Sequence, residues 1–120
     1  MSTVLAVDDS VTMRQMVGYC LREAGYQVVE AVDGVDALAK LQAQRVDLVI
    51  TDLYMPHMDG IELIKQVRAL KSHRFTPILM LTTETQGGRK AEGQAAGATG
   101  WIVKPFEPQQ LLKVIKRVLC

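Results

Sequence analysis

The sequence has little of what marks a secreted, membrane-spanning or nucleic-acid-binding protein. It contains two cysteines, Cys20 on the apolar side of an expected helix and Cys120 at the last position, so we expect free thiols and no structural disulfide. No apolar run approaches the roughly 20 residues that span a bilayer. The formal net charge is only +1, whereas binding to nucleic acids or membranes requires concentrated positive charge. We therefore expect a cytoplasmic protein with neither nucleic acid nor membrane as a partner.

The sequence does have the length and the apolar content of one compact domain. Its 120 residues, 48% of them hydrophobic, fit a single domain over 1–120. Short runs rich in Val, Ile and Leu are expected to be strands at about 4–8, 27–31, 47–52, 77–82 and 99–103. Helical patterns lie between and after them at about 10–24, 34–44, 61–70, 88–96 and from 108 onwards. This alternation predicts an α/β fold with a parallel sheet covered by helices on both faces.

The expected helices differ in how much apolar surface they can bury. In 10–24 an apolar stripe at three-and-four spacing is expected to face the core, namely Met13, Met16, Val17, Cys20, Leu21 and Ala24. In 88–96 only Ala91, Ala95 and Ala96 are expected to face the core, and Gly93 to interrupt the helix. We therefore expect this fourth helix to be the element held least firmly and the first to move.

Four of the expected strands end in polar residues that a parallel sheet would bring to one edge. Asp8 and Asp9 follow the first strand, Asp52 ends the third, Thr82 ends the fourth and Lys104 follows the fifth. Ligand sites of open α/β sheets form at this carboxyl edge. A hard cation such as Mg2+ takes oxygen ligands and keeps several waters, so two or three carboxylates suffice to hold it. Mg2+ and the lysine would balance the three carboxylates and leave a pocket that can accept a phosphoryl group.

Each of these residues also has a simpler interpretation. Asp9-Ser10 is a typical helix cap, the threonine is a common strand residue, and a lysine at a strand end is usually solvated. Asp59-Gly60 is best interpreted as a turn into the third helix. His57 and His73 lie in loop-like sequence and are expected to be exposed. The charge balance at the sheet edge favours the functional interpretation of the strand-end residues.

Taken in order, these residues resemble the receiver domain of two-component response regulators, in particular its stand-alone chemotaxis (CheY-like) type. The resemblance covers essentially the whole chain and is closest in the segments 7–14, 33–38, 55–60 and 103–106. It implies a flavodoxin-like, doubly wound sheet of five parallel strands in the order 2-1-3-4-5, with five helices. It further implies that Asp52 accepts a phosphoryl group from the histidine of a histidine kinase.

The same resemblance implies a ligand set for Mg2+. Asp9, Asp52 and the backbone carbonyl of Tyr54 would bind the ion directly, and Asp8 would act through bound water. Lys104 would pair with the phosphoacceptor and then with the phosphoryl oxygens.

The resemblance also assigns roles to the last two strand ends. Thr82 would swing in to hydrogen-bond the phosphoryl group. The peptide bond between Lys104 and Pro105 is one that is cis in this family.

Four residues mark where the chain departs from the family pattern or can be tuned. Trp101 occupies the position of the switch aromatic, which is often Tyr or Phe, and both a rotamer switch and fixed packing stay open for it. Tyr54 and Glu84 stand two residues after the phosphoacceptor and the switch threonine, at positions that border the phosphoryl group. Thr83 is bulkier than the small residue that often follows the switch threonine in the family. We expect Tyr54 to screen the phosphoryl group from the attacking water and Glu84 to influence the rate of its hydrolysis. We expect Thr83 to narrow the access of the phosphodonor.

The expected function is that of a monomeric, single-domain response regulator in chemotaxis. Its partners would be a histidine kinase, an output target such as a flagellar motor switch, and a phosphatase. No linker follows the fifth helical pattern, so we expect a noncovalent output partner. It would not be an enzyme beyond phosphorylating and dephosphorylating itself.

Other functions are kept as alternatives. Within the receiver family, a phosphate sink and a regulator outside chemotaxis stay open. A phosphatase with an aspartate nucleophile would carry a second Asp where Tyr54 stands. A flavin-binding electron carrier would have Ser, Thr and Gly in place of Asp8-Asp9, whose charges repel phosphate.

Overall fold

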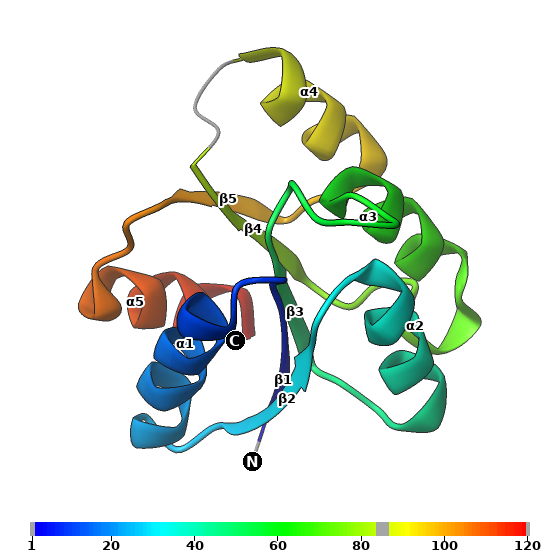
Figure 1. The fold of residues 1–120 in the computed structure, drawn as a ribbon. Helices are drawn as coiled ribbons and strands as arrows, with labels where there is room; N and C mark the ends of the chain where they lie inside the picture. Colours follow the sequence, from blue (N-terminus) through cyan, green and yellow to red (C-terminus); the bar gives the residue numbers. More distant parts are fainter. Residues whose placement is uncertain (1, 84–86, 120) are drawn as a thin grey trace.

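The computed structural model describes residues 2–83 and 87–119, and strands alternate with helices along them (Figure 1). The strands are β1 (Thr3–Val7), β2 (Gln27–Ala31), β3 (Leu48–Thr51), β4 (Ile78–Thr82) and β5 (Gly100–Val103). The helices are α1 (Val11–Glu23), α2 (Gly34–Ala43), α3 (Gly60–Ala69), α4 (Gly87–Ala96) and α5 (Pro108–Leu119), with a short 3-10 helix, η1, at Lys71–His73. These bounds agree closely with the ranges predicted from the sequence.

All the strands are parallel and lie in the order β2-β1-β3-β4-β5. This confirms the predicted α/β class and the strand order that the family resemblance implied. The register pairs Val7 with both Ala31 and Thr51, and Thr82 with Val103. The strands therefore finish side by side, and the residues that follow them gather at the carboxyl edge of the sheet.

Each face of the sheet has its own apolar core. Helices α2 and α3 lie on one face of the sheet, and α1 and α5 lie on the other (Figure 1). Because side chains alternate along a strand, Leu5 and Val7 belong to the first core, and Val4 and Ala6 belong to the second. The first core includes Ala37, Leu41, Ile61, Leu63, Ile64 and Val67, and the second includes Val17, Cys20, Leu21, Leu111 and Ile115. Burial on both faces explains why the strands are continuous apolar runs in the sequence.

Side-chain caps set where three of the helices begin. Ser10, Asp33 and Asp59 each accept a hydrogen bond from the backbone N–H three residues later, at 3.2, 2.8 and 2.8 Å. Pro108 is the first residue of α5, as predicted, where its missing N–H would have no partner in any case. Within the described residues, no helix is long and apolar enough to cross a membrane.

Two residues of the apolar stripe predicted for α1 are not buried. Met16 is 52% exposed, and Ala24 is exposed at the position just after the helix ends. The buried face is formed by Val17, Cys20 and Leu21. Consecutive residues are about 100° apart around a helix, so Met16 is turned away from this face toward solvent.

The fourth helix is continuous, contrary to the prediction that Gly93 interrupts it. Gly93 is buried, and a Cβ at this position would lie 2.9 Å from Cζ3 of Trp101, so glycine lets α4 approach β5 closely. Ala91 and Ala95, predicted to face the core, are exposed, and Ala96 is partly buried. Little apolar surface therefore holds α4, and its readiness to move stays a prediction.

His73 is buried, contrary to the prediction that it is exposed, whereas His57 is exposed as predicted. The His73 Nε2 accepts a hydrogen bond from the backbone N–H of Val46 at 3.2 Å, and its Nδ1 lies 2.8 Å from Oγ of Ser72. Because Nε2 accepts, the ring is neutral in this arrangement. The side chain thereby joins η1 to the segment that leads into β3.

We expect His73 to make the free energy of unfolding fall as the pH drops below about 6.5, the ordinary pKa of histidine. Burial, and after it the charge of Arg45, lower the pKa of His73. The folded state therefore favours the neutral ring, whose contribution is complete above the ordinary pKa and is lost as the pH falls toward the lowered value. Urea unfolding of the wild type and of His73→Gln across this range tests the expectation. The amide oxygen of Gln can still accept from Val46, so the variant should depend less on pH, and an equal dependence would contradict this account.

Candidate functional site

Three carboxylates meet at the carboxyl edge of the sheet. One carboxylate oxygen from each of Asp8, Asp9 and Asp52 lies within 4.8 Å of the other two. Asp8 directly follows β1 and is buried, Asp52 directly follows β3 and is partly buried, and Asp9 is exposed. The cluster therefore runs from the interior to the surface, and its outer side is open to solvent.

Lys104 bridges two of these carboxylates. Its Nζ lies 2.9 Å from Oδ2 of Asp8 and 3.1 Å from Oδ2 of Asp52, and its side chain is 10% exposed. Burial alone lowers the pKa of Lys104, but the hydrogen bonds to Asp8 and Asp52 outweigh burial and leave this pKa raised. The lysine is therefore charged at neutral pH. It follows β5, and its peptide bond to Pro105 is cis.

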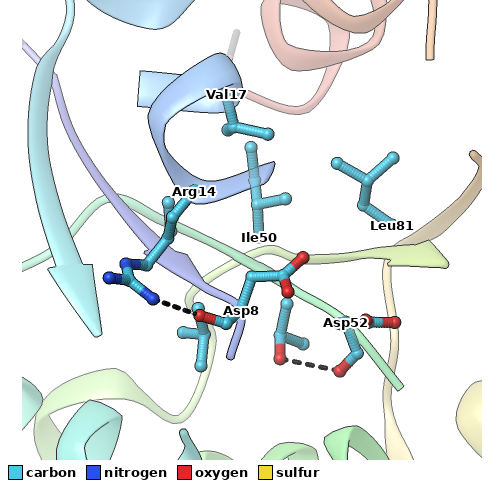
Figure 2. A pocket seen from close by; sticks show the side chains of 9 residues that line it. Asp8, Arg14, Val17, Ile50, Asp52 and Leu81 are labelled. Carbon is cyan, nitrogen blue, oxygen red and sulfur yellow. Dashed lines mark hydrogen bonds between the residues drawn. The ribbon is translucent and has the colours of Figure 1, made fainter. Parts of the chain in front are cut away.

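Local hydrogen bonds fix the direction of the two inner carboxylates, Asp8 and Asp52, whose side chains Figure 2 shows. Oδ1 of Asp8 accepts from the backbone N–H of Ser10 at 2.9 Å, and Oδ1 of Asp52 accepts from that of Leu53 at 2.7 Å. Thr51 donates its hydroxyl to the backbone carbonyl of Asp52 at 2.9 Å. In each inner carboxylate Oδ1 thus binds the backbone while Oδ2 faces Lys104.

Gly60 lets the start of α3 close onto the chain just after β3. Its N–H donates to the carbonyl of Leu53 at 2.7 Å. A Cβ at position 60 would overlap the backbone carbonyl oxygen of Asp52. A side chain here would push α3 and the end of β3 apart, so this glycine helps to place Asp52.

The donor set fits a hard divalent cation. The three carboxylates carry a formal charge of −3 and Lys104 contributes +1, which leaves −2 for a divalent ion to balance. Mg2+ prefers oxygen ligands and retains waters, which the exposed side of Asp9 accommodates. No sulfur or imidazole belongs to this cluster of described residues, so nothing in it favours a softer metal.

Of the remaining predicted site residues, the structure describes Thr82, Trp101, Tyr54 and Thr83. Thr82 is fully buried at the end of β4, where its backbone carbonyl accepts from the N–H of Lys104 at 2.9 Å. Trp101, on β5, is partly buried and packs beside α4. Tyr54 is 52% exposed, and Thr83 is exposed. Glu84 lies outside the described residues.

One hydrogen bond and one ion pair hold the loop between β3 and α3, and neither was predicted from the sequence. Nδ1 of His57 lies 3.0 Å from Oδ2 of Asp33, and Nη2 of Arg89 lies 3.0 Å from Oδ2 of Asp59. The guanidinium of Arg89 also lies 5.9 Å from the ring centre of Tyr54. The loop that carries the Tyr54 carbonyl is therefore tied to the start of α2 and to α4. The partners in each contact are far apart in the sequence, so no local sequence pattern could predict them.

Arg14 is a further residue near the site that the sequence reasoning did not single out. Its Nη1 donates to the backbone carbonyl of Asp8 at 2.7 Å, and its side chain is 12% exposed (Figure 2). A lone arginine beside an apolar stripe is the only sequence signal for this contact. Such an arginine is usually a solvated residue.

The fold and the site together define a class of protein. It is an open parallel α/β domain with an acidic cluster, bridged by a lysine, at the carboxyl edge of its sheet. Residues 4–116 match the family model of the response regulator receiver domain. The chain belongs to this family, as the sequence resemblance indicated.

Several relatives are similar over nearly the whole chain. The chemotaxis protein CheY1 of Helicobacter pylori is 45% identical over 97% of this chain and 95% of its own length. The chemotaxis protein CheY of Pseudomonas aeruginosa is 39% identical over 96% and 94%. The transcriptional regulatory protein PhoP of Bacillus subtilis is 37% identical over 97% of this chain, which spans only 48% of that longer protein.

Solved structures show the same fold. Chemotaxis protein CheY4 of Vibrio cholerae superposes with a TM-score of 0.96, at 57% identity and 99% coverage of both chains. The receiver domain of a Pseudomonas aeruginosa sensor histidine kinase has a TM-score of 0.92, at 28% identity and coverage of 98% and 97%. That structure was solved with a magnesium ion coordinated in its active site cleft.

Proposed function

We propose that this chain is a stand-alone response regulator whose Asp52 accepts a phosphoryl group from a histidine kinase in a Mg2+-dependent reaction. The observation that carries the proposal is the position of the Lys104 ammonium, which contacts both Asp8 and Asp52 beside the third carboxylate of Asp9. A carboxylate held beside a fixed cation is what acceptance of a phosphoryl group would require, and this supports the proposal.

In the proposed transfer, an Asp52 carboxylate oxygen attacks the phosphorus of a phosphohistidine. The new O–P bond forms as the N–P bond breaks, and the electron pair of the N–P bond returns to the imidazole. Phosphoryl transfer passes through a loose transition state, so positioning and charge neutralisation matter more than covalent help. Lys104 supplies one positive charge to the phosphoryl oxygens, and Thr82 is proposed to turn toward them and donate its hydroxyl.

Mg2+ is the proposed cofactor, and when bound it would neutralise charge on the transferring group. Asp9, Asp52 and the Tyr54 carbonyl would hold it directly, and Asp8 would act through water. The fit of the donor set supports this assignment. So does the magnesium ion in the related Pseudomonas aeruginosa receiver.

The proposed biological setting is chemotaxis. Two curated relatives that match over nearly their whole length are chemotaxis proteins, as is the Vibrio cholerae structure at 57% identity. The output target would be a protein such as a flagellar motor switch, with a phosphatase as a further partner. A phosphate sink stays the alternative. We propose a phosphoacceptor rather than an enzyme that turns over external substrates.

We propose further roles for the residues that respond to phosphorylation and for those that set its rates. The charge that phosphorylation adds would pull Thr82 and Lys104 inward and move α4, with Trp101 as the aromatic that responds. Tyr54 and Glu84 are proposed to tune the hydrolysis of the phosphorylated form, and Thr83 to narrow the access of the phosphodonor. The decay of label in Tyr54→Asn measures the first of these roles, and an unchanged rate would exclude it.

Removing the metal should abolish phosphorylation. We expect the wild-type chain to incorporate phosphoryl from a small phosphodonor such as acetyl phosphate when Mg2+ is present, and to lose this incorporation when EDTA is added. Excess Mg2+ should restore it. Incorporation that is equal with and without the metal would contradict the proposed cofactor, and continuous turnover of simple phosphate esters would favour a phosphatase instead.

A further inference from the structure

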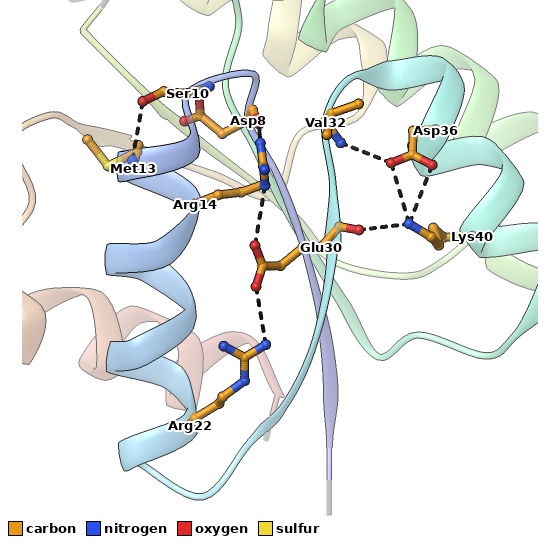
Figure 3. Close-up of polar contacts among 9 residues, drawn as sticks. All are labelled: Asp8, Ser10, Met13, Arg14, Arg22, Glu30, Val32, Asp36 and Lys40. Carbon is orange, nitrogen blue, oxygen red and sulfur yellow. Dashed lines mark hydrogen bonds and ion pairs between the residues drawn. The ribbon is translucent and has the colours of Figure 1, made fainter.

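Arg14 makes a contact with the acidic site that no catalytic step requires. It lies in the first half of α1, and its guanidinium reaches back to the end of β1, where Nη1 donates to the backbone carbonyl of Asp8 at 2.7 Å (Figures 2 and 3). The side chain is 12% exposed. A mostly buried guanidinium with a short hydrogen bond is a fixed element of the structure rather than a solvated surface charge.

The other side of the same guanidinium is anchored to β2. Nε of Arg14 lies 3.3 Å from Oε1 of Glu30, and Nη2 of Arg22 lies 3.2 Å from Oε2 of the same residue. Both arginines reach from α1 to this strand residue (Figure 3). The backbone carbonyl of Glu30 accepts from Nζ of Lys40 in α2 at 2.9 Å. Glu30 is therefore held from both helices, and it gives Arg14 a firm support.

The carbonyl that Arg14 holds belongs to the peptide unit between Asp8 and Asp9. This unit is planar, so a hydrogen bond that holds its oxygen restrains the orientation of the plane that joins the two aspartates. The N–H of Asp8 donates to Ala31 on β2, and its Oδ1 accepts from Ser10. Arg14 thus completes the restraint on the peptide from which the exposed Asp9 carboxylate projects.

We propose that Arg14 is a positioning residue for the cation site: it orients the Asp8–Asp9 peptide so that both carboxylates stand ready for a divalent ion. The inference rests on the proposed function, because it concerns the same Mg2+ site. Groups that orient metal ligands typically change metal affinity by about 10- to 100-fold when they are removed.

The sign of the effect separates positioning from charge. Arg14 is a cation near a site for a cation, so by charge alone its removal would tighten Mg2+ binding. Positioning predicts the opposite, a weaker affinity. The structure also supplies a matched control, since Arg22 lies on the same helix and pairs with the same Glu30, whereas the hydrogen bond to the Asp8 carbonyl comes from Arg14.

The test is Mg2+ titration of the full chain by calorimetry. We expect Arg14→Gln to weaken the affinity by about 10- to 100-fold, and Arg22→Gln to leave it within about two-fold. Arg14→Lys keeps the charge, but a single ammonium cannot reproduce the planar fork that spans both acceptors, so we expect it to weaken binding as well. Urea unfolding of each variant shows whether it is folded during the titration.

The outcomes are distinct. An Arg14→Gln affinity that is unchanged or tighter would overturn the inference alone, and so would an equal loss in Arg22→Gln. Wild-type protein that does not bind Mg2+ would contradict the proposed function and this inference with it. If Arg14→Gln does not fold, Glu30→Gln would remove the anchor of Arg14. This carboxamide also removes a negative charge near the site, so by charge alone it would weaken Mg2+ binding, and the deciding second variant is therefore Arg14→Lys, which keeps the charge. An unchanged affinity in Arg14→Lys would overturn the inference.

Discussion

Asp52→Asn is expected to lose covalent phosphorylation completely and to remain folded. The amide has the shape of the carboxylate, and its oxygen can still accept from the backbone N–H of Leu53, which now binds Oδ1 at 2.7 Å. The amide is not a nucleophile, however, and it leaves Lys104 with one carboxylate partner in place of two. Labelling with a small phosphodonor in Mg2+ measures the loss, and circular dichroism checks the fold.

Asp59→Asn is the matched control for this experiment. Asp59 stands on the loop after β3, caps α3 through Glu62 N–H at 2.8 Å, and pairs with Arg89. Asn caps a helix about as well as Asp, so the variant loses a carboxylate close to the site without losing the start of α3. We expect it to reach the same final extent of labelling as the wild type, because the phosphoacceptor is intact. Retained labelling in Asp52→Asn would contradict the assignment of the phosphoacceptor.

Lys104→Met is expected to slow phosphorylation by about 100-fold at saturating Mg2+, since removal of one stabilising group from a transition state costs on the order of 100- to 1,000-fold. Met fills nearly the same volume without the charge. The variant leaves Asp8 and Asp52 side by side without the cation that now lies 2.9 and 3.1 Å from them. Initial rates of labelling measure the effect.

The same variant makes a prediction for stability. An uncompensated pair of partly buried carboxylates destabilises the fold, and a bound divalent ion would relieve their repulsion. Mg2+ should therefore raise the free energy of unfolding of Lys104→Met more than that of the wild type. Lys113→Met, a change at an exposed position of α5, should alter neither the labelling rate nor the response to Mg2+. Equal behaviour of the two variants would contradict the role of Lys104.

The fold and the centre of the site follow from patterns that are local in the sequence. Short apolar strands alternate with amphipathic helices, and a parallel sheet brings the ends of its strands to one edge. Asp8, Asp52 and Lys104 could therefore be placed together before the geometry was known, because each directly follows an apolar run.

The remaining features depend on contacts between distant segments. His73 is buried because η1 folds its ring against Val46, and position 93 suits glycine because Trp101 occupies the space that a side chain would need. The contact of Arg14 joins a side chain to a backbone carbonyl, and any residue could supply that carbonyl. Such contacts leave no signature in residue type, so only the tertiary structure shows them.

The central claim is that Asp52 carries the phosphoryl group, and chemical trapping tests it most directly. Borohydride reduces an aspartyl phosphate to homoserine, so wild-type protein treated with a phosphodonor and Mg2+, reduced and mapped by peptide mass spectrometry should show homoserine at position 52. The account predicts this product at position 52 alone, and its loss when Mg2+ is withheld. Homoserine at position 8, 9 or 59, with an unmodified residue at 52, would contradict it.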